Sequence, residues 1–348
     1  MKLTKEQWRF LSVIDALGGR ACIDIIGRLC PLTPGPLIDL LEFSESCGWI
    51  KKTKDKALVI TDSIAPEARK KIEAVNNPAH LISLINRINE EKLMDQIEIK
   101  TVARLMQRAG RLAEAATLEI DLAQEALTKN RPDRALPHLQ KIAGYLDGKG
   151  FKHDIGASFI FIVIEWLDIS FAAGKVSVEI ENIIQKALSL AEKIGDQRST
   201  AVLKLHLGRH FYLTDRRDDA LVALSIGIED IEALGDKGIH HQSAVLQGFY
   251  FFIQGRFKKV LEYLENVVLP NRNDEHDRIK DPMSPIIYGY SAAYLGKFHQ
   301  AIGTLDSHCR IAESQGNKSY AATLRSILGT ILVLLKKHKE GQIHLDRA

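Results

Sequence analysis

The stretch 247–257 (QGFYFFIQGRF) decides the fold, because its pattern returns at a regular distance along the chain. Its first glycine, Gly248, has counterparts at Gly208, Gly289 and Gly329, which gives a period of about 40 residues, a length found in helical repeat proteins. A second set of positions keeps the same phase and follows each glycine at one constant spacing: Ala220, Val260, Ala301 and Gly341. A fixed period of this kind is typical of a solenoid in which helix pairs stack on one another.

Another group of glycines marks the turn between one helix pair and the next. Gly235 lies one period after Gly195, and Gly316 lies two periods after Gly235. Gly174 stands one period before Asp215, which extends the pattern back by one unit. We therefore predict a mainly α protein in which 151–348 form α-α superhelical repeats of about 40 residues each.

Composition sets limits on the kind of protein. The 348 residues are 45% hydrophobic and 26% charged, with a net charge of +3, so no strong basic field favours nucleic acid. The four cysteines (Cys22, Cys30, Cys47 and Cys309) form no CxxC pair, which favours reduced thiols and a cytoplasmic protein.

Neither a signal peptide nor a membrane segment is expected. The first residues carry an acid, Glu6, and lead into an amphipathic helix. The most apolar run, 159–164, is followed by Glu165 and Asp168, so we interpret it as part of a buried helix.

The sequence pattern of residues 1–76 predicts a small winged-helix-like domain. Thr4 can cap a first helix with Gln7 at the capping-box position, 23–29 form a second helix, and Pro34 starts a third. Two strands, 49–52 and 58–60, then flank a lysine-rich turn. A basic helix from Pro66 ends at 76–78 (NNP), where we place the domain boundary.

A winged helix raises the alternative of a DNA-binding transcriptional regulator whose repeats act as the sensor. The third helix, which would enter the major groove, offers Asp39, Glu42 and Glu45 and no basic residue, which argues against DNA. The wing lysines, Lys51, Lys52 and Lys54, could contact a phosphate backbone but could not specify a sequence alone.

Residues 77–150 predict a helical connector with divergent repeats. The segments 110–116 (GRLAEAA) and 130–136 (NRPDRAL) each have a turn followed by a helix start, but they fit the period of the later repeats only loosely.

The helix pairs resemble tetratricopeptide repeats. The turns at 191–196 (AEKIGD) and 231–236 (IEALGD), with their long period, are similar to the subtype found in bacterial STAND signalling ATPases of the maltose-activator kind. The winged helix followed by 108–127 (RAGRLAEAATLEIDLAQEAL) and 130–142 (NRPDRALPHLQKI) is similar to the segment after the nucleotide-binding domain of those proteins. The chain departs from them in having no ATPase module and in stopping part-way through a helix, so we expect it to belong to a longer polypeptide.

The resemblance implies that the first helix of each pair lines a concave groove. The residues expected there are Arg209, Tyr212, Phe249, Phe252, Tyr290 and Tyr294. Aromatic walls with an arginine would suit an extended peptide or an amphipathic helix. The same aromatics could instead form the core between repeats, and the sequence leaves both interpretations open.

No catalytic, cofactor-binding or metal-binding set can be assembled from the sequence. The loop 144–150 (GYLDGKG) resembles a phosphate-binding loop only superficially, because it is one residue short and has glycine where serine or threonine would hold magnesium. The histidines, His240 and His241 included, are scattered. We therefore expect a regulatory or scaffolding interaction module and no enzyme. Its solenoid would bind a protein, a peptide or a small inducer and signal to an effector.

Overall fold

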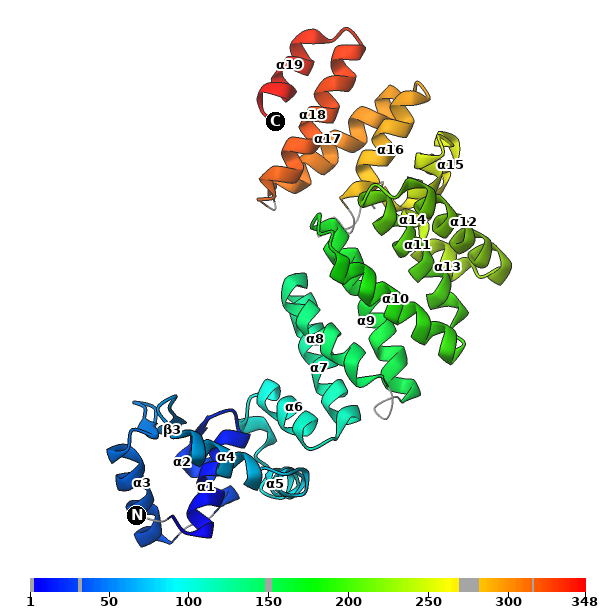
Figure 1. The fold of residues 1–348 in the computed structure, drawn as a ribbon. Coiled ribbons are helices and arrows are strands. Elements are labelled where there is room, and N and C mark those ends of the chain that lie inside the picture. Colours follow the sequence, from blue (N-terminus) through cyan, green and yellow to red (C-terminus); the bar gives the residue numbers. More distant parts are fainter. Residues whose placement is uncertain (1–2, 31–32, 148–151, 269–281, 315) are drawn as a thin grey trace. The chain divides into compact units, whose positions relative to one another are not determined.

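The computed structural model describes residues 3–30, 33–147, 152–268, 282–314 and 316–348 (Figure 1). These residues form mainly helices, and the chain divides into two compact units, Met1–Ile155 and Gly156–Ala348. The boundary predicted at residue 76 lies within the first unit and stays a prediction.

The first unit contains the described strands. Its elements, in chain order, are α1 (Lys5–Ala16), β1 (Arg20–Cys22), α2 (Ile23–Leu29), α3 (Pro34–Ser46), β2 (Ile50–Lys52), β3 (Ala57–Ile60), α4 (Pro66–Val75), α5 (Pro78–Glu90), the 3-10 helix η1 (Met94–Gln96), α6 (Ile99–Arg108), α7 (Leu112–Thr128) and α8 (Pro132–Tyr145).

Helices α1 to α3 and a three-stranded antiparallel sheet fit a winged helix. The capping box is confirmed: Thr4 Oγ1 accepts from the Gln7 backbone N–H at 3.2 Å, and the Thr4 backbone N–H donates to Gln7 Oε1 at 2.9 Å. The predicted hairpin is confirmed as β2 and β3, with Lys51 opposite Val59. Strand β1 was not predicted. It pairs with the other edge of β3, giving the order β1-β3-β2.

Polar contacts join the start of the unit to the helices that follow the sheet. Asn76, at the end of α4, donates from Nδ2 to the Ser12 carbonyl at 3.0 Å and to the Asp15 carboxylate at 2.9 Å. Arg108 of α6 donates to the same Asp15 carboxylate at 3.2 Å. One carboxylate of α1 therefore holds both the end of α4 and the end of α6.

Helices α7 and α8 form a pair around a buried carboxylate. Glu119 of α7 is buried and accepts from Lys141 Nζ of α8 at 2.7 Å, and His138 of α8 contacts its second oxygen. Burial and the Glu119 charge raise the pKa of Tyr145 to about 12.

The second unit consists of helices in its described part. They are α9 (His153–Ala172), which starts just before the boundary, α10 (Val178–Ile194), α11 (Gln197–Leu213), α12 (Arg217–Leu234), α13 (Lys237–Gln242), α14 (Ala244–Ile253), α15 (Phe257–Val268), α16 (Met283–Tyr294), α17 (Phe298–Ser314), α18 (Lys318–Leu334) and α19 (His338–Asp346).

The predicted glycine phase marks the closest approach within each pair. A Cβ added at Gly208, Gly289 or Gly329 would lie 2.5–2.8 Å from a leucine Cγ on the partner helix, at Leu224, Leu305 and Leu345 respectively. Because a residue without a side chain stands at these positions, α11, α16 and α18 pack closely on α12, α17 and α19. The result is a solenoid of stacked helix pairs, like that of tetratricopeptide repeats.

The turn inside each pair needs a left-handed residue, and glycine is not always used. Gly255 and Gly296 have φ of 70° and 75° at this position, while Asp215 and Lys336 adopt φ of 60° and 63°. The following residue is basic in each of these turns, at Arg216, Arg256, Lys297 and Lys337.

The helix that pairs with α15 is broken into two parts, α13 and α14, which the sequence did not predict. The chain ends α13 at Gln242 and resumes as α14 after Ser243, whose hydroxyl donates to the Ile239 carbonyl at 2.6 Å. Gln247 Nε2 in turn donates to Ser243 Oγ at 2.8 Å. The Ser243 backbone N–H also donates to the Ile239 carbonyl, at 2.9 Å, so the side chain adds to a helical hydrogen bond, and such contacts often bend helices.

Helix α9 contains the apolar run predicted to be part of a buried helix. It is long and apolar enough to cross a membrane by length and composition alone. Within the structure, 56% of its apolar 18-residue stretch is buried. Phe159, Val163, Trp166 and Leu167 are among its buried side chains.

Candidate partner-binding surface

Arg209, Phe249 and Tyr290 each follow one of the repeat glycines, so they share a repeat position. Their exposure to solvent nevertheless differs. Arg209 and Phe249 are 1% and 3% exposed, whereas Tyr290 is 43% exposed. Tyr212 and Phe252, three residues further along α11 and α14, are half-buried. The six residues predicted for the groove are therefore not on one open surface.

Arg209 and Phe249 are buried because each meets an aromatic ring of a neighbouring first helix. Phe249 of α14 packs edge-on against Tyr212 of α11, with ring centroids 5.2 Å apart. The Arg209 guanidinium lies 5.1 Å from the centroid of the Phe171 ring of α9. Cation–π and edge-to-face contacts of this kind favour core packing at these two positions.

The last two helix pairs carry several exposed apolar side chains near their turns. Tyr294 of α16 is 77% exposed, Leu334 of α18 is 76% exposed, and Phe298 of α17 is 36% exposed. Tyr294 also packs on the half-buried Phe257 of α15, with ring centroids 4.5 Å apart. We call this set, with Tyr290, the aromatic edge: Phe257, Tyr290, Tyr294, Phe298 and Leu334.

Sequence reasoning named two members of the aromatic edge, Tyr290 and Tyr294, and missed the rest. A usable signal was present. Leu334 lies one repeat period after Tyr294, and Phe298 lies one period after Phe257, so both pairs keep the phase at the turn inside the helix pair. Their distance from the marker glycines, rather than any motif, places them beside the turn.

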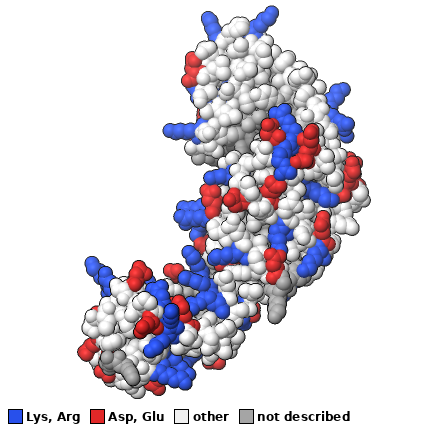
Figure 2. Space-filling model, viewed as in Figure 1, with Lys and Arg blue, Asp and Glu red and all other residues white. Residues whose placement is uncertain are grey.

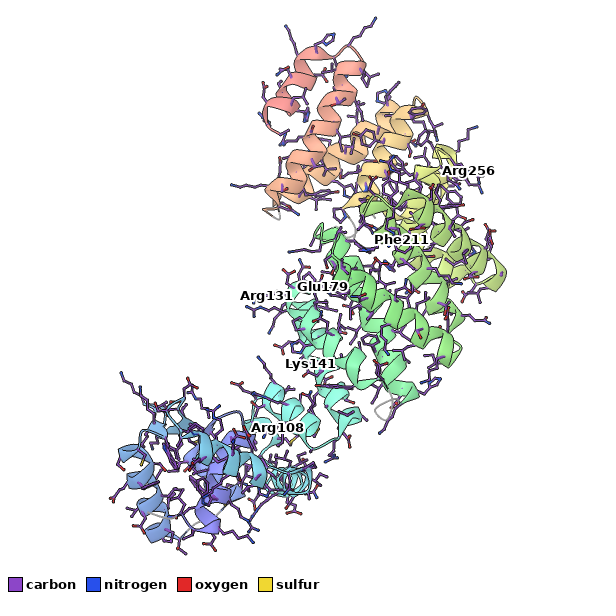
Figure 3. All side chains as sticks on the ribbon, in the orientation of Figure 1. Arg108, Arg131, Lys141, Glu179, Phe211 and Arg256 are labelled. Carbon is purple, nitrogen blue, oxygen red and sulfur yellow. The ribbon has the colours of Figure 1, made fainter. Side chains whose placement is uncertain are left out.

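Charged side chains of both signs are interspersed over the face shown in Figure 2. At the turn between α14 and α15, Arg256 is exposed (Figure 3). On the wing, Lys51, Lys52 and Lys54 are all exposed. The wing's Asp55 carboxylate accepts from Arg20 at 2.6 Å, and hydrogen bonds from Thr53 and Arg20 lower the pKa of Asp55.

A buried polar cluster lies on α11, away from the aromatic edge. His206 and His210 are both buried, and their rings lie 6.1 Å and 6.5 Å from that of Phe171. Burial, with a contribution from the Arg209 charge, lowers the pKa of His206 to about 3. Burial also lowers the pKa of His210, although the Glu181 carboxylate 3.6 Å away opposes that shift.

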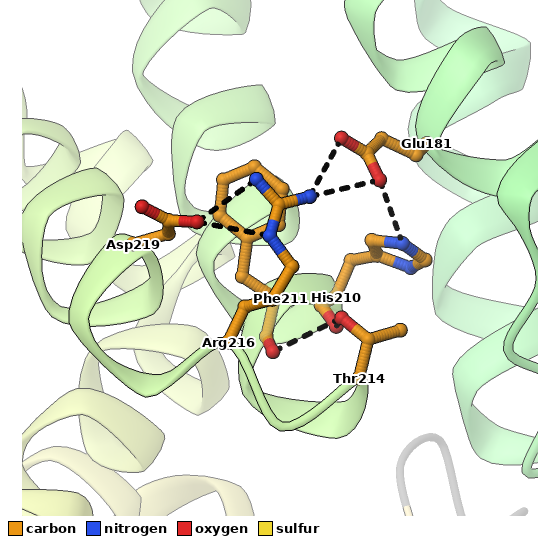
Figure 4. Close-up of polar contacts among 6 residues, drawn as sticks. All are labelled: Glu181, His210, Phe211, Thr214, Arg216 and Asp219. Atoms are coloured by element: carbon orange, nitrogen blue, oxygen red, sulfur yellow. Dashed lines mark hydrogen bonds and ion pairs between the residues drawn. The ribbon is translucent and has the colours of Figure 1, made fainter.

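Glu181 of α10 belongs to an ion-pair network that ties two helix pairs together (Figure 4). Arg216 donates to both Glu181 oxygens, at 3.0 Å and 3.2 Å, and its Nε donates to Asp219 at 2.9 Å. The guanidinium carbon of Arg216 also lies 3.9 Å from the centroid of the Phe211 ring. This network fixes the turn between α11 and α12 against α10.

Potential metal ligands do not cluster in the described part of the chain. No group of three or more His, Cys, Asp or Glu that could hold a metal ion occurs among them. His240 contacts Gln247 at 3.4 Å, which gives this histidine a place in the helix break. Part of the glycine-rich loop considered as a phosphate site, 148–150, lies outside the described residues.

The chain resembles solved structures but no known sequence family. No protein-family model matches the chain, and no curated protein matches it. It is similar to the crystal structure of a Signal Transduction ATPase with Numerous Domains (STAND) protein with a tetratricopeptide repeat sensor from Pyrococcus horikoshii, with 15% identity and a TM-score of 0.47. The match covers 99% of this chain and 62% of that one. A similarity of this size does not assign the chain to that family.

Proposed function

We propose that the chain is the interaction module of a signalling regulator, in which the helix-pair unit binds a protein or peptide partner and passes the bound state to an effector. The observation that carries the proposal is the aromatic edge. Tyr290 and Tyr294 of α16 and Leu334 of α18 expose large apolar surfaces on the first helices of two adjacent pairs, and these two helices contact each other. Clustered exposed apolar residues on a folded surface mark interaction sites more often than isolated ones do.

Tyrosine is well suited to such a role. Its ring supplies contact area at a small cost in side-chain entropy, and its hydroxyl can form a hydrogen bond at the rim of an interface. The tyrosines at 290 and 294 are one helical turn apart on α16, so they present one continuous stripe.

The proposal is tested by affinity capture with the double variant Tyr290→Ser and Tyr294→Ser. A partner retained by the wild type, identified by mass spectrometry and rebound from purified components, should be lost with this variant. The control is Val222→Ser, which removes an exposed apolar side chain of α12 outside the aromatic edge. Equal retention of that purified partner by the double variant and the control contradicts the proposed surface.

A DNA-binding regulator is the second candidate, favoured by the exposed wing lysines at 51, 52 and 54. Against it stand Asp39, Glu42 and Glu45, which are exposed on α3. A gel shift at low salt that is lost on Lys51→Glu, Lys52→Glu and Lys54→Glu would support it. The absence of any shift at low salt would exclude it, because phosphate contacts are strongest there.

A further inference from the structure

The turns inside the last three helix pairs share a composition that the aromatic edge alone does not explain. Each brings a basic residue, then an aromatic or histidine, then a further basic residue or histidine. The segments are 256–258 (RFK), 297–299 (KFH) and 337–339 (KHK). Apart from the half-buried Phe257, these residues are exposed. The three turns lie on the same side of the second unit (Figure 1).

The cations in these turns are largely without carboxylate partners. Among the described residues, Lys337 pairs with Glu340 at 3.4 Å, and no ion pair is formed by Arg256, Lys258 or Lys297. The turn between α11 and α12 contrasts with this, because there Arg216 pairs with Glu181 and Asp219, and Arg217 with Asp215. Among the described residues, positive charge is therefore balanced at the turn between α11 and α12, whereas Arg256, Lys258 and Lys297 at the later turns form no ion pair.

Apolar side chains stand beside the cations of these turns. Tyr294 and Phe298 flank Lys297, and Leu334 precedes Lys337 by less than one helical turn. Contacts between α14 and α16 and between α16 and α18 make these first helices neighbours. Cationic and apolar side chains thus alternate along one edge, which we call the basic edge: Arg256, Lys258, Lys297 and Lys337, with Tyr294, Phe298 and Leu334.

We propose that the basic edge binds an acidic peptide segment that carries leucine or aromatic side chains. This deepens the proposed function and rests on it, since it names the chemistry of the partner. Carboxylates of the peptide would pair with the unbalanced lysines and arginine, and its apolar side chains would cover Tyr294 and Leu334.

Single-stranded nucleic acid fits the same surface less well. Bases need open aromatic faces on which to stack. Here the ring planes of Tyr294 and Phe257 are tilted by 46° against each other, and Leu334 provides no ring at all. A peptide with aliphatic side chains can use both kinds of anchor, which is why the geometry favours it.

The test is a selection from a random peptide display library against the full chain, followed by fluorescence anisotropy with the enriched peptides. Enriched sequences should combine Asp or Glu with Leu or Phe, and their affinity should fall as salt is raised. Replacing each peptide Glu by Gln should weaken binding. The double variant Lys258→Glu and Lys297→Glu should weaken it on the order of tenfold. The matched control is Lys237→Glu and Lys318→Glu, two exposed lysines at the opposite ends of the helix pairs.

The outcomes separate this inference from the proposed function. Enriched peptides that are neutral or basic, or equal affinities for the two charge-reversed variants, overturn the acidic partner while peptide binding stands. If no peptide is enriched, and if the Tyr290→Ser and Tyr294→Ser variant retains the same partner as the wild type in affinity capture, both the acidic partner and the proposed function are overturned. Tighter binding of an oligo-dT strand than of any peptide, lost with Lys258→Glu and Lys297→Glu, overturns the peptide in favour of nucleic acid. The Glu-to-Gln peptides decide the question even if a protein variant fails to fold.

Discussion

Leu264 of α15 occupies the space where a side chain at Gly248 of α14 would lie. A Cβ built on Gly248 would be 2.8 Å from Leu264 Cγ and 2.9 Å from Cδ2, and Leu264 is fully buried. Such distances are shorter than a carbon–carbon contact allows, so either helix or side chain must move when Gly248 is replaced.

We expect Gly248→Leu to lower the free energy of unfolding by roughly 1–3 kcal/mol, the usual cost of overpacking a core. Gly248→Ala should also destabilise, for the same reason. Gly303→Ala is the matched control, because Gly303 lies in α17 with nothing within 4 Å of its added Cβ. There alanine should stabilise by up to about 1 kcal/mol through helix propensity. Urea unfolding followed by circular dichroism measures both, and changes of the same sign would refute the close approach.

Periodicity was sufficient to predict the helix pairs because it reports which positions must be small. Gly208, Gly289 and Gly329 share one phase of the repeat, and each lies at a close approach between the two helices of its pair. The capping box at Thr4 and the hairpin of β2 and β3 were equally local signals. Strand β1 is three residues long and follows two glycines, so no alternation of its own marked it.

Periodicity could not predict which side chains are exposed, because exposure depends on the side chains that the neighbouring repeat packs against them. Arg209 and Tyr290 share a repeat position, yet one is buried and the other is not. Phe171, far from Arg209 in sequence, supplies the ring over which the guanidinium lies. The break at Ser243 also escaped prediction, because neither glycine nor proline stands at that position in the sequence.

The Arg216 network should stabilise the second unit in a salt-dependent way. Arg216→Gln removes the ion pairs with Glu181 and Asp219, so we expect a lower thermal midpoint at low salt. The deficit should shrink in 1 M salt, where the screening length is about 3 Å. Arg217→Gln is the control, because Arg217 is 75% exposed and pairs with Asp215 two residues away. Equal shifts for both variants would show that Arg216 does not hold α10 in place.

The buried Glu119 should matter to the first unit in a way that exposed carboxylates do not. Glu119→Gln removes the negative charge of a carboxylate that accepts from Lys141 and contacts His138. We expect the free energy of unfolding to fall by roughly 1–3 kcal/mol, as for other buried hydrogen-bonded groups. Glu125→Gln on the same helix, where the exposed Glu125 pairs with Lys129, should leave stability unchanged. Hydrogen exchange of α7 and α8 reports both, and equal protection in the two variants would contradict a role for the buried pair.

His206 should make the second unit sensitive to acid. Its folded-state pKa of about 3 is below the ordinary value of 6.5, because burial, with a contribution from the Arg209 charge, disfavours the protonated ring. Below pH 6.5 the unfolded chain takes up a proton that the folded chain does not, so stability falls as pH falls towards 3. At pH 5 this one group costs roughly 2 kcal/mol, at about 1.4 kcal/mol per pH unit. His206→Gln should flatten the decline between pH 6.5 and 5, measured by urea unfolding across that range, while His338→Gln, at an exposed site of α19, should not. An unchanged slope in His206→Gln would mean that the acid sensitivity comes from another group, with His210 as the next to substitute.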